Sequence, residues 1–142
     1  MIDGAIANAN TEKNRVLQKL PGFVRKVVED IKKNEKVVAI ILFGSWAKGR
    51  VTPLSDIDLA VIIKEPDPKT EAEIGSMCSR MIDISLFHKL PVYIQHSILK
   101  DGIVLYLKKE DEDFYKEVVF KVIRNYLEME WIYRKRLKEV FG

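Results

Sequence analysis

Residues 37–63 read VVAIILFGSWAKGRVTPLSDIDLAVII, and in this stretch two apolar runs enclose a polar loop. The first run, residues 37–43, is continuously apolar and rich in β-branched side chains, which is typical of a strand covered on both faces. Glycine, serine, threonine and proline between residues 44 and 55 indicate a loop. The second run, residues 56–63, predicts another strand but contains Asp56 and Asp58. Because an unpaired buried carboxylate is costly, these two side chains need a compensating partner.

The flanking sequence predicts the remaining elements. A helical pattern runs from Thr11 to Ile31 with a break at Pro21 and Gly22, and a short helix could begin at residues 46–48. Further along, the patterns predict a loop at 64–70, a helix at 70–80, a strand at 81–87, a helix at 91–100, a strand at 103–107 and a helix at 111–140. This order predicts an α+β (α/β-like) fold with a small mixed sheet of about four strands flanked by helices. We expect a single domain over residues 1–142, with its core at 37–107 and a long C-terminal helix at 111–140.

Composition limits the possible functions. The 142 residues include 47% hydrophobic and 32% charged residues, with a formal net charge of +3. These values are typical of a folded globular domain, and the charge alone does not argue for nucleic-acid binding. The single cysteine, Cys78, excludes an intramolecular disulfide and a cysteine-based zinc cluster. No apolar run approaches the roughly 20 residues that span a bilayer, so we expect a cytoplasmic protein without membrane or direct nucleic-acid contacts.

The two aspartates of the second strand suggest a metal site. Side chains alternate between the faces of a strand, so Asp56 and Asp58 share one face, about 7 Å apart. Two such anions repel each other unless a cation lies between them. A hard divalent ion such as Mg²⁺ prefers oxygen ligands, and one D-x-D strand can serve two ions about 3.5–4 Å apart. The sequence therefore predicts a two-ion Mg²⁺ site at this strand.

The glycine and serine that follow the first strand suggest an anion site. Gly44 lets a ligand approach the backbone, and the N–H groups and hydroxyl that begin at Ser45 can hold a phosphate. Lys48 lies one helical turn further and could add a positive charge. If the two strands are neighbours, the phosphate site and the metal site share one end of the sheet, as phosphoryl-transfer chemistry requires.

A third acid is expected, because the attacking hydroxyl needs a base and the metal ions need further ligands. Asp83 is the only acid in the apolar strand MIDISLF at residues 81–87. Each signal alone has a structural explanation, since Gly-Ser pairs form turns and aspartates cap strands and helices. Their combination, Gly44-Ser45, ten residues, D-x-D and an isolated strand aspartate, favours a functional site.

The motif GSWAKGRVTPLSDIDLAV resembles the active-site signature of the DNA polymerase β-type nucleotidyltransferase superfamily. The small size and the G-S-x-A-[RK]-G pattern followed by S-D-I-D-L are similar to its minimal nucleotidyltransferase (MNT) branch. This resemblance implies that Gly44 and Ser45 hold the triphosphate and that Asp56 and Asp58 bind two Mg²⁺ ions. It also implies that Asp83 is the third carboxylate, which helps to activate the acceptor hydroxyl. Lys48 stands where many relatives have arginine.

The MNT resemblance also implies a partner. MNT proteins are typically encoded beside a HEPN-domain ribonuclease, and the two form a type VII-like toxin–antitoxin pair. In such a pair the antitoxin transfers AMP from ATP to a tyrosine of the toxin. The R-x4-6-H motif of HEPN proteins does not occur here, since neither His88 nor His96 follows an arginine at that spacing. We therefore expect the transferase half alone, with structural roles for both histidines.

The long C-terminal segment is the expected partner surface. As one helix, residues 111–140 would extend about 45 Å, which is longer than a domain of this size can cover. Its apolar stripe is wide, which favours contact with a HEPN partner or a second copy of the chain. Alternatively, the stripe covers the N-terminal helix and the sheet.

Two further functions remain open from the sequence. The acceptor could be a small molecule, as in antibiotic nucleotidyltransferases, although those relatives usually carry an added helical domain. The chain could also be a binding-only antitoxin or regulatory module that uses ATP weakly or not at all. Retention of all three acids favours an active enzyme.

Overall fold

The computed structural model describes residues 15–16, 18–50 and 56–142. Its helices are α2 (Gly22–Lys32), α3 (Pro68–Gly75), α4 (Val92–Asp101) and α5 (Glu112–Phe141), and its 3-10 turns are η1 (Phe87–Lys89) and η2 (Lys109–Asp111). Its strands are β1 (Val37–Phe43), β2 (Ile57–Ile63), β3 (Ile82–Leu86) and β4 (Ile103–Leu107). The absence of periodicity expected at residues 1–10 lies outside the described residues.

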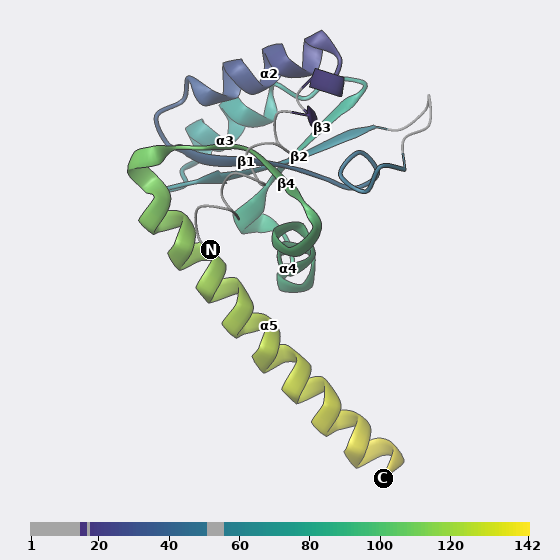
Figure 1. Ribbon diagram of the computed structural model, residues 1–142. Helices are drawn as coiled ribbons and strands as arrows, with labels where there is room; N and C mark the ends of the chain where they lie inside the picture. The colour runs from purple at the N-terminus through teal and green to yellow at the C-terminus, as the bar shows by residue number, and fades with distance from the viewer. Residues whose placement is uncertain (1–14, 17, 51–55) are drawn as a thin grey trace, which may run out of the picture.

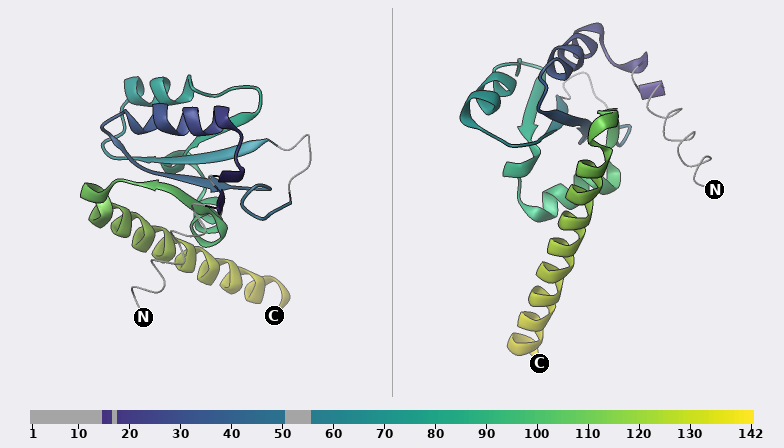
Figure 2. Two further views of the ribbon diagram at one scale, coloured as in Figure 1. Left: turned by 45° about the horizontal axis from the view of Figure 1, so that its top comes forward. Right: turned by 90° about the vertical axis from the view of Figure 1, so that its left-hand side faces the viewer.

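The predicted α+β architecture is confirmed. The four strands form one mixed sheet in the order β3-β2-β1-β4. Strand β1 pairs antiparallel with β2 and with β4, while β2 pairs parallel with β3. Helices α2 and α3 cover one face of this sheet, and α4 and α5 cover the other (Figures 1 and 2). The chain therefore folds into three layers around the sheet.

The two central strands are buried on both faces, which explains their continuous apolar sequences. In β1, Ile40 and Leu42 face α2 and α3, whereas Ala39 and Ile41 belong to the cluster under α4 and α5. All four side chains are at most 1% exposed. Strands β1 and β4 have the bounds expected from the sequence. Strand β2 begins at Ile57, so Asp56 lies just before it.

Two local predictions differ from the structure. Residues 44–49 form consecutive turns rather than the short helix expected from 46–48. Helix α3 begins at Pro68, inside the segment expected to be a loop, because Asp67 caps it: its side chain accepts a hydrogen bond from Thr70 N at 2.8 Å. The fixed φ of Pro68 suits the first helical position.

Helix α5 lies against the domain over only part of its length. It contacts α4, β1 and η2, and Val122 is its one buried residue. The alternative in which α5 covers the N-terminal helix and the sheet is confirmed for the sheet, through the contact with β1. Helix α2 packs on the opposite face, so α5 does not cover that part of the N-terminal helix. Beyond the domain, α5 extends away from the other described elements (Figures 1 and 2). Among the described helices, none combines the length and apolar character needed to cross a membrane.

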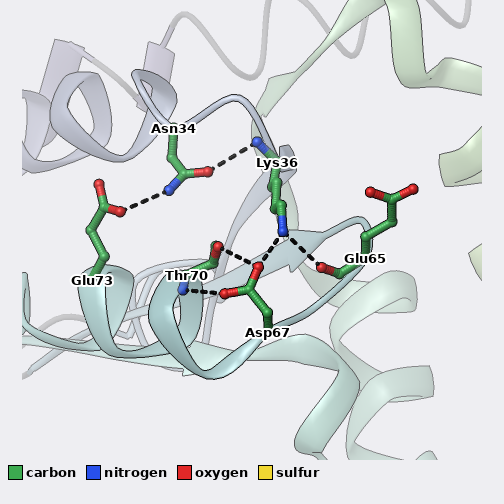
Figure 3. A network of polar contacts seen from close by, with 6 residues as sticks. All are labelled: Asn34, Lys36, Glu65, Asp67, Thr70 and Glu73. Atoms are coloured by element: carbon green, nitrogen blue, oxygen red, sulfur yellow. Dashed lines mark hydrogen bonds and ion pairs between the residues drawn. The ribbon is translucent and has the colours of Figure 1, made fainter.

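A polar network around Asp67 joins three elements (Figure 3). Lys36, just before β1, forms an ion pair with Asp67 and donates to the carbonyl oxygen of Glu65 at 3.2 Å. Thr70 Oγ1 donates to the same carboxylate at 3.1 Å. The hydrogen bond from Lys36, followed by that from the Thr70 N–H, lowers the pKa of Asp67 to about 2. The network thus fixes the start of α3 against the start of β1.

Replacing Asp67 with alanine should destabilise the fold, because α3 loses its cap and Lys36 loses its partner. We expect the melting temperature at pH 7 to fall by roughly 2–5 °C. A carboxyl group whose pKa is depressed in the folded state stabilises above its unfolded pKa, and this contribution is lost as pH falls. The difference from wild type should therefore shrink between about pH 4 and about pH 2, measured by thermal unfolding.

Glu65→Ala is the matched control, because Glu65 contacts Lys36 only through its backbone carbonyl. Its melting temperature should stay close to that of the wild type at every pH. Equal losses in the two variants would contradict the role assigned to the Asp67 carboxylate.

Candidate active site

The strand pairing brings the predicted site residues to one edge of the sheet. Strands β2 and β3 are parallel and both begin at this edge, whereas the antiparallel β1 ends there. Asp58 pairs with Phe43 of β1 on one side and with Asp83 of β3 on the other. Gly44 follows Phe43 directly. Gly44, Asp58 and Asp83, which are far apart in the sequence, are therefore neighbours.

Alternation along the strands decides which face the carboxylates occupy. Ile57, Leu59 and Val61 enter the core beneath α2 and α3, as the sequence predicted for this side of β2. Asp58 consequently points to the opposite face, together with Ala60. Asp83 lies between Ile82 and Ile84, which enter the α2–α3 core, so it points to the same face as Asp58. This is the face that carries α4.

The carboxylates are close enough to influence one another. Asp58 is half-buried, whereas Asp56 and Asp83 are exposed. Burial raises the pKa of Asp58, and the charges of Asp83 and then Asp56 raise it further. The ionised form of Asp58 is thus destabilised first by burial and then by repulsion from the other two carboxylates, and a bound cation would oppose both effects.

The donor set suits a divalent cation that also binds phosphate. Among the described residues, no group of three or more His, Cys, Asp or Glu side chains converges in a way that could enclose one metal ion. A cation at this edge would thus be held by one or two of the three carboxylates. Mg²⁺ binds in this manner, with substrate phosphates and water as its other ligands.

Gly44 is required by its contact with Asp58. Its φ is +74°, a conformation that side chains with a Cβ rarely adopt. A Cβ atom built on Gly44 would lie 2.3 Å from Asp58 Oδ2. The backbone after β1 therefore passes directly against the carboxylate, and a side chain at residue 44 would displace the Asp58 carboxylate from its present position.

In the turn at residues 44–49, the first carbonyl groups point toward N–H groups that come later in the chain. Gly44 O accepts from Lys48 N at 3.2 Å, and Ser45 O accepts from Arg50 N at 2.9 Å. As in the first turn of a helix, carbonyls that point forward leave the N–H groups at the start of the turn pointing back. Backbone N–H groups in such a turn form a concave site for anions. Ser45 and Lys48 are both exposed, so they are accessible to a ligand.

A cavity of about 170 Å³ lies beside this turn. One wall comes from the segment after β1, and the other comes from a single face of α4. Its lining residues are Phe43, Gly44, Ala47, Lys48, Ile94, Ser97, Ile98, Asp101 and Gly102. The sequence analysis did not identify the α4 residues, because nothing local to residues 91–102 indicates that this helix packs beside Gly44.

The two histidines have structural contacts. His88 Nε2 lies 2.8 Å from Glu71 Oε1, which links η1 to α3. The His96 ring stacks on the Tyr126 ring with 3.7 Å between centroids, which joins α4 to α5. These contacts account for both histidines without a role in the site.

Comparisons with known proteins agree in the family they indicate. The family described as "Polymerase beta, Nucleotidyltransferase" matches residues 25–111. Two similar proteins come from Methanocaldococcus jannaschii. "Putative protein adenylyltransferase MJ1547" is 37% identical over 83 residues, covering 57% of this chain and 66% of that protein. "Putative protein adenylyltransferase MJ1215" is 32% identical over 73 residues, covering 51% and 85%. The chain thus spans slightly less than two thirds of the first of these relatives.

Solved structures share the fold. A chain of a toxin–antitoxin structure with AMP-PNP superposes with a TM-score of 0.61 at 21% identity, covering 84% of this chain and 97% of that one. A chain from a Shewanella oneidensis complex of a tri-AMPylated HEPN toxin with its MNT antitoxin gives a TM-score of 0.54 at 17% identity, covering 94% and 99%. At these identities the likeness concerns the fold alone.

Replacing Gly44 with alanine should destabilise the protein more than the same change at Gly49. The two glycines have similar φ values, +74° and +70°, but nothing lies within 4 Å of a Cβ at Gly49. Gly49→Ala should therefore cost only the unfavourable backbone conformation, about 1–2 kcal/mol. Gly44→Ala adds overlap with Asp58 and should cost roughly twice as much.

Denaturant unfolding of the two variants measures this difference. Combining Gly44→Ala with Asp58→Ala should recover the steric part of the loss, because the overlapping oxygen is removed. Equal losses of unfolding free energy in Gly44→Ala and Gly49→Ala would show that Gly44 and Asp58 do not approach each other closely.

Proposed function

The chain belongs to the polymerase β nucleotidyltransferase family, and on this premise we propose that it transfers AMP from ATP to a tyrosine of a HEPN-domain partner protein, with Mg²⁺. The observation that carries this proposal is the contact between Gly44 and Asp58, with Asp83 beside Asp58 on the next strand. A phosphate-binding turn and a carboxylate cluster in contact are what phosphoryl transfer requires.

The similar proteins support the choice of nucleotide and acceptor. Both relatives from M. jannaschii are named for protein adenylyl transfer. Among the solved structures of the same fold, one contains AMP-PNP and another contains an AMPylated HEPN toxin with an MNT antitoxin. These proteins motivate ATP as donor and a HEPN tyrosine as acceptor for this chain.

We assign a separate role to each residue of the proposed site. The turn at Gly44 and Ser45 holds the β- and γ-phosphates through its N–H groups, and Lys48 contributes a positive charge. Asp58 at the start of β2 and Asp56 just before it would hold the cations that bind the α-phosphate. Two Mg²⁺ ions held by these carboxylates would neutralise phosphate charge and lower the pKa of the acceptor hydroxyl. Asp58 lies at the start of β2, and the turn at Gly44 follows the end of β1 directly, so the strand pairing positions both groups before the reaction.

Asp83 is the proposed base. The acceptor phenol gives its proton to the Asp83 carboxylate, and the phenol oxygen forms a bond to the α-phosphorus. The bond from that phosphorus to the oxygen bridging to the β-phosphate breaks, and pyrophosphate leaves with the electron pair. Asp83 is exposed on the outer strand of the sheet, where an acceptor on another protein can reach it.

Helix α5 is the proposed surface for the partner. Several large apolar side chains on it are exposed, including Phe120 at 71%, Trp131 at 64% and Phe141 at 83%. Together with Leu127 these residues lie along one side of the helix, at i, i+7, i+11 and i+21. A projecting helix with this much exposed apolar surface is typical of a protein-binding element.

Transfer can be tested with ATP labelled at the α-phosphate and a HEPN-domain protein from the same organism. We expect label on a tyrosine of the partner with the wild type, and a loss of at least about 100-fold with Asp58→Asn. The pKa of Asp58 is raised in the fold, so its ionised form destabilises the protein at neutral pH. Asp58→Asn should consequently melt at a higher temperature than wild type in metal-free buffer, which separates lost chemistry from lost folding.

The same assay distinguishes the two other candidate functions. If the partner protein is not labelled but an aminoglycoside or another small hydroxyl compound is, the acceptor is a small molecule rather than a HEPN tyrosine. Full inhibition of the partner ribonuclease by Asp58→Asn, without transfer, would show that binding through α5 suffices. No transfer to any acceptor with several nucleotides and divalent metals would overturn the enzyme proposal itself.

Trp131→Glu tests the proposed partner surface. A buried charge in the middle of an apolar interface should weaken the complex with the HEPN protein by at least about tenfold. Arg136→Glu is the control, because this exposed residue lies about 140° around α5 from Trp131. Titration calorimetry measures both affinities. An unchanged affinity for Trp131→Glu would place the partner elsewhere, whereas ATP binding should be the same in all three proteins.

A further inference from the structure

The cavity beside Gly44 adjoins the carboxylate cluster but is built by other residues. Gly44 belongs to both, since it contacts Asp58 and lines the cavity. The opposite wall is formed by Ile94, Ser97, Ile98 and Asp101, at helical spacings i, i+3, i+4 and i+7 of α4. A ligand bound at the phosphate turn could therefore extend into this cavity without crossing the sheet.

The close packing of α4 on the strands fixes the width of the cavity. A Cβ atom built on Gly102, the residue that ends α4, would lie 2.6 Å from Ile41 Cγ2 and 3.1 Å from Leu42 O. The end of α4 is thus seated against β1 at Ile41 and Leu42, two to three residues before Gly44. This contact sets the distance between the α4 wall and the turn at Gly44.

The cavity lining is mostly apolar and includes one basic and one acidic residue, Lys48 and Asp101. Phe43, Ala47, Ile94 and Ile98 supply the apolar lining. Lys48 lies on the side of the phosphate turn, whereas Asp101 lies at the C-terminal end of α4. The backbone carbonyls at a helix C-terminus add partial negative charge to that of Asp101. The α4 side therefore accepts hydrogen bonds from N–H groups and disfavours phosphate.

The volume suits part of a nucleotide rather than all of it. Pockets that enclose a complete drug-sized ligand measure about 300–1,000 Å³, and this cavity measures about 170 Å³. A flat heteroaromatic ring between apolar walls, with its donor edge toward a carboxylate, matches both the size and the polarity. Triphosphate would remain outside, at the turn and the carboxylates.

We propose that this cavity binds the adenine base of ATP and that Asp101 determines the preference for it. In this arrangement the 6-amino group of adenine donates a hydrogen bond to the Asp101 carboxylate, and the ring lies between Ala47 and Ile98. The inference rests on the proposed function in that the bound molecule is a nucleoside triphosphate. It adds the location of the base and a residue that selects it.

The first test compares ATP with purine riboside triphosphate, which lacks only the 6-amino group. Binding is measured by calorimetry with Mg²⁺ and without an acceptor, so no transfer is needed. Wild type should bind ATP about tenfold more tightly than the analogue, as expected for a hydrogen bond to a charged group. Asp101→Ala should bind the two nucleotides equally, whereas Asp101→Asn, which keeps an acceptor oxygen, should retain part of the preference.

Asp101→Ala also removes a negative charge, which by itself favours binding of any anion. Glu117→Gln makes the same change in net charge at an exposed position of α5 outside the cavity lining. This control should keep the full preference for ATP. The preference is a ratio within each variant, so a general effect of charge or stability cancels.

A second variant tests whether the cavity holds the base or the phosphates. Ser97 is exposed on α4 at the cavity wall. Ser97→Phe would fill the cavity and leave the carboxylates of Asp58 and Asp83 on the strands unchanged. We expect this variant to lose at least about tenfold in ATP affinity and to bind inorganic tripolyphosphate with Mg²⁺ as wild type does. An equal loss of tripolyphosphate binding would place phosphate in the cavity and overturn the inference.

The outcomes separate this inference from the function on which it rests. Equal binding of ATP and the analogue by wild type, or an unchanged preference in Asp101→Ala, overturns the base site and leaves the proposed transferase intact. Failure of wild type to bind any nucleoside triphosphate with Mg²⁺ overturns the proposed function together with the base site.

Discussion

The alignment of Phe43 with Asp58 across the β1–β2 ladder is the constraint on which the site depends. It places the chain after β1 directly against the Asp58 carboxylate, and residue 44 there has a left-handed conformation that favours glycine. The parallel pairing of β2 with β3 then places Asp83 on the other side of Asp58. Because side chains alternate strictly along a strand, a shift of one residue in either pairing would turn a carboxylate into the core and an isoleucine toward the ligand.

The same arrangement opposes folding. Half-burial and two neighbouring charges raise the pKa of Asp58, so its ionised form is unfavourable in the isolated protein. Stability comes from elsewhere: from central strands that are apolar on both faces, and from the network in which Asp67 caps α3 and pairs with Lys36. The site can thus keep a concentration of negative charge because the core around it is rigid and well covered. Ligand binding would relieve that repulsion, so binding and stability are linked.

Helices α4 and α5 cover the sheet face opposite α2 and α3, and each has a different role there. Helix α4 is seated against β1 through Gly102 and presents one of its faces to the cavity beside Gly44. Helix α5 is held by α4 and the sheet near its start and leaves most of its apolar side chains exposed. The stacked rings of His96 and Tyr126 join the two helices. In the proposed function, α4 recognises the nucleotide and α5 holds the protein that is modified. Asp83 is exposed on the outer strand β3 and is accessible to that protein.

The sequence by itself determined the strands, the mixed α+β fold and the family resemblance, because period-two alternation and short motifs are local signals. From the same signals it predicted a site at Gly44, Ser45, Asp56, Asp58 and Asp83. It also indicated that α5 is too long for the domain. Only the tertiary structure decided that residues 44–49 are turns, that α5 lies on the face opposite α2, and that Ser97 and Asp101 line a cavity beside Gly44. These depend on how helices pack on the sheet, and packing is set by contacts between segments far apart in the chain, which no local pattern records.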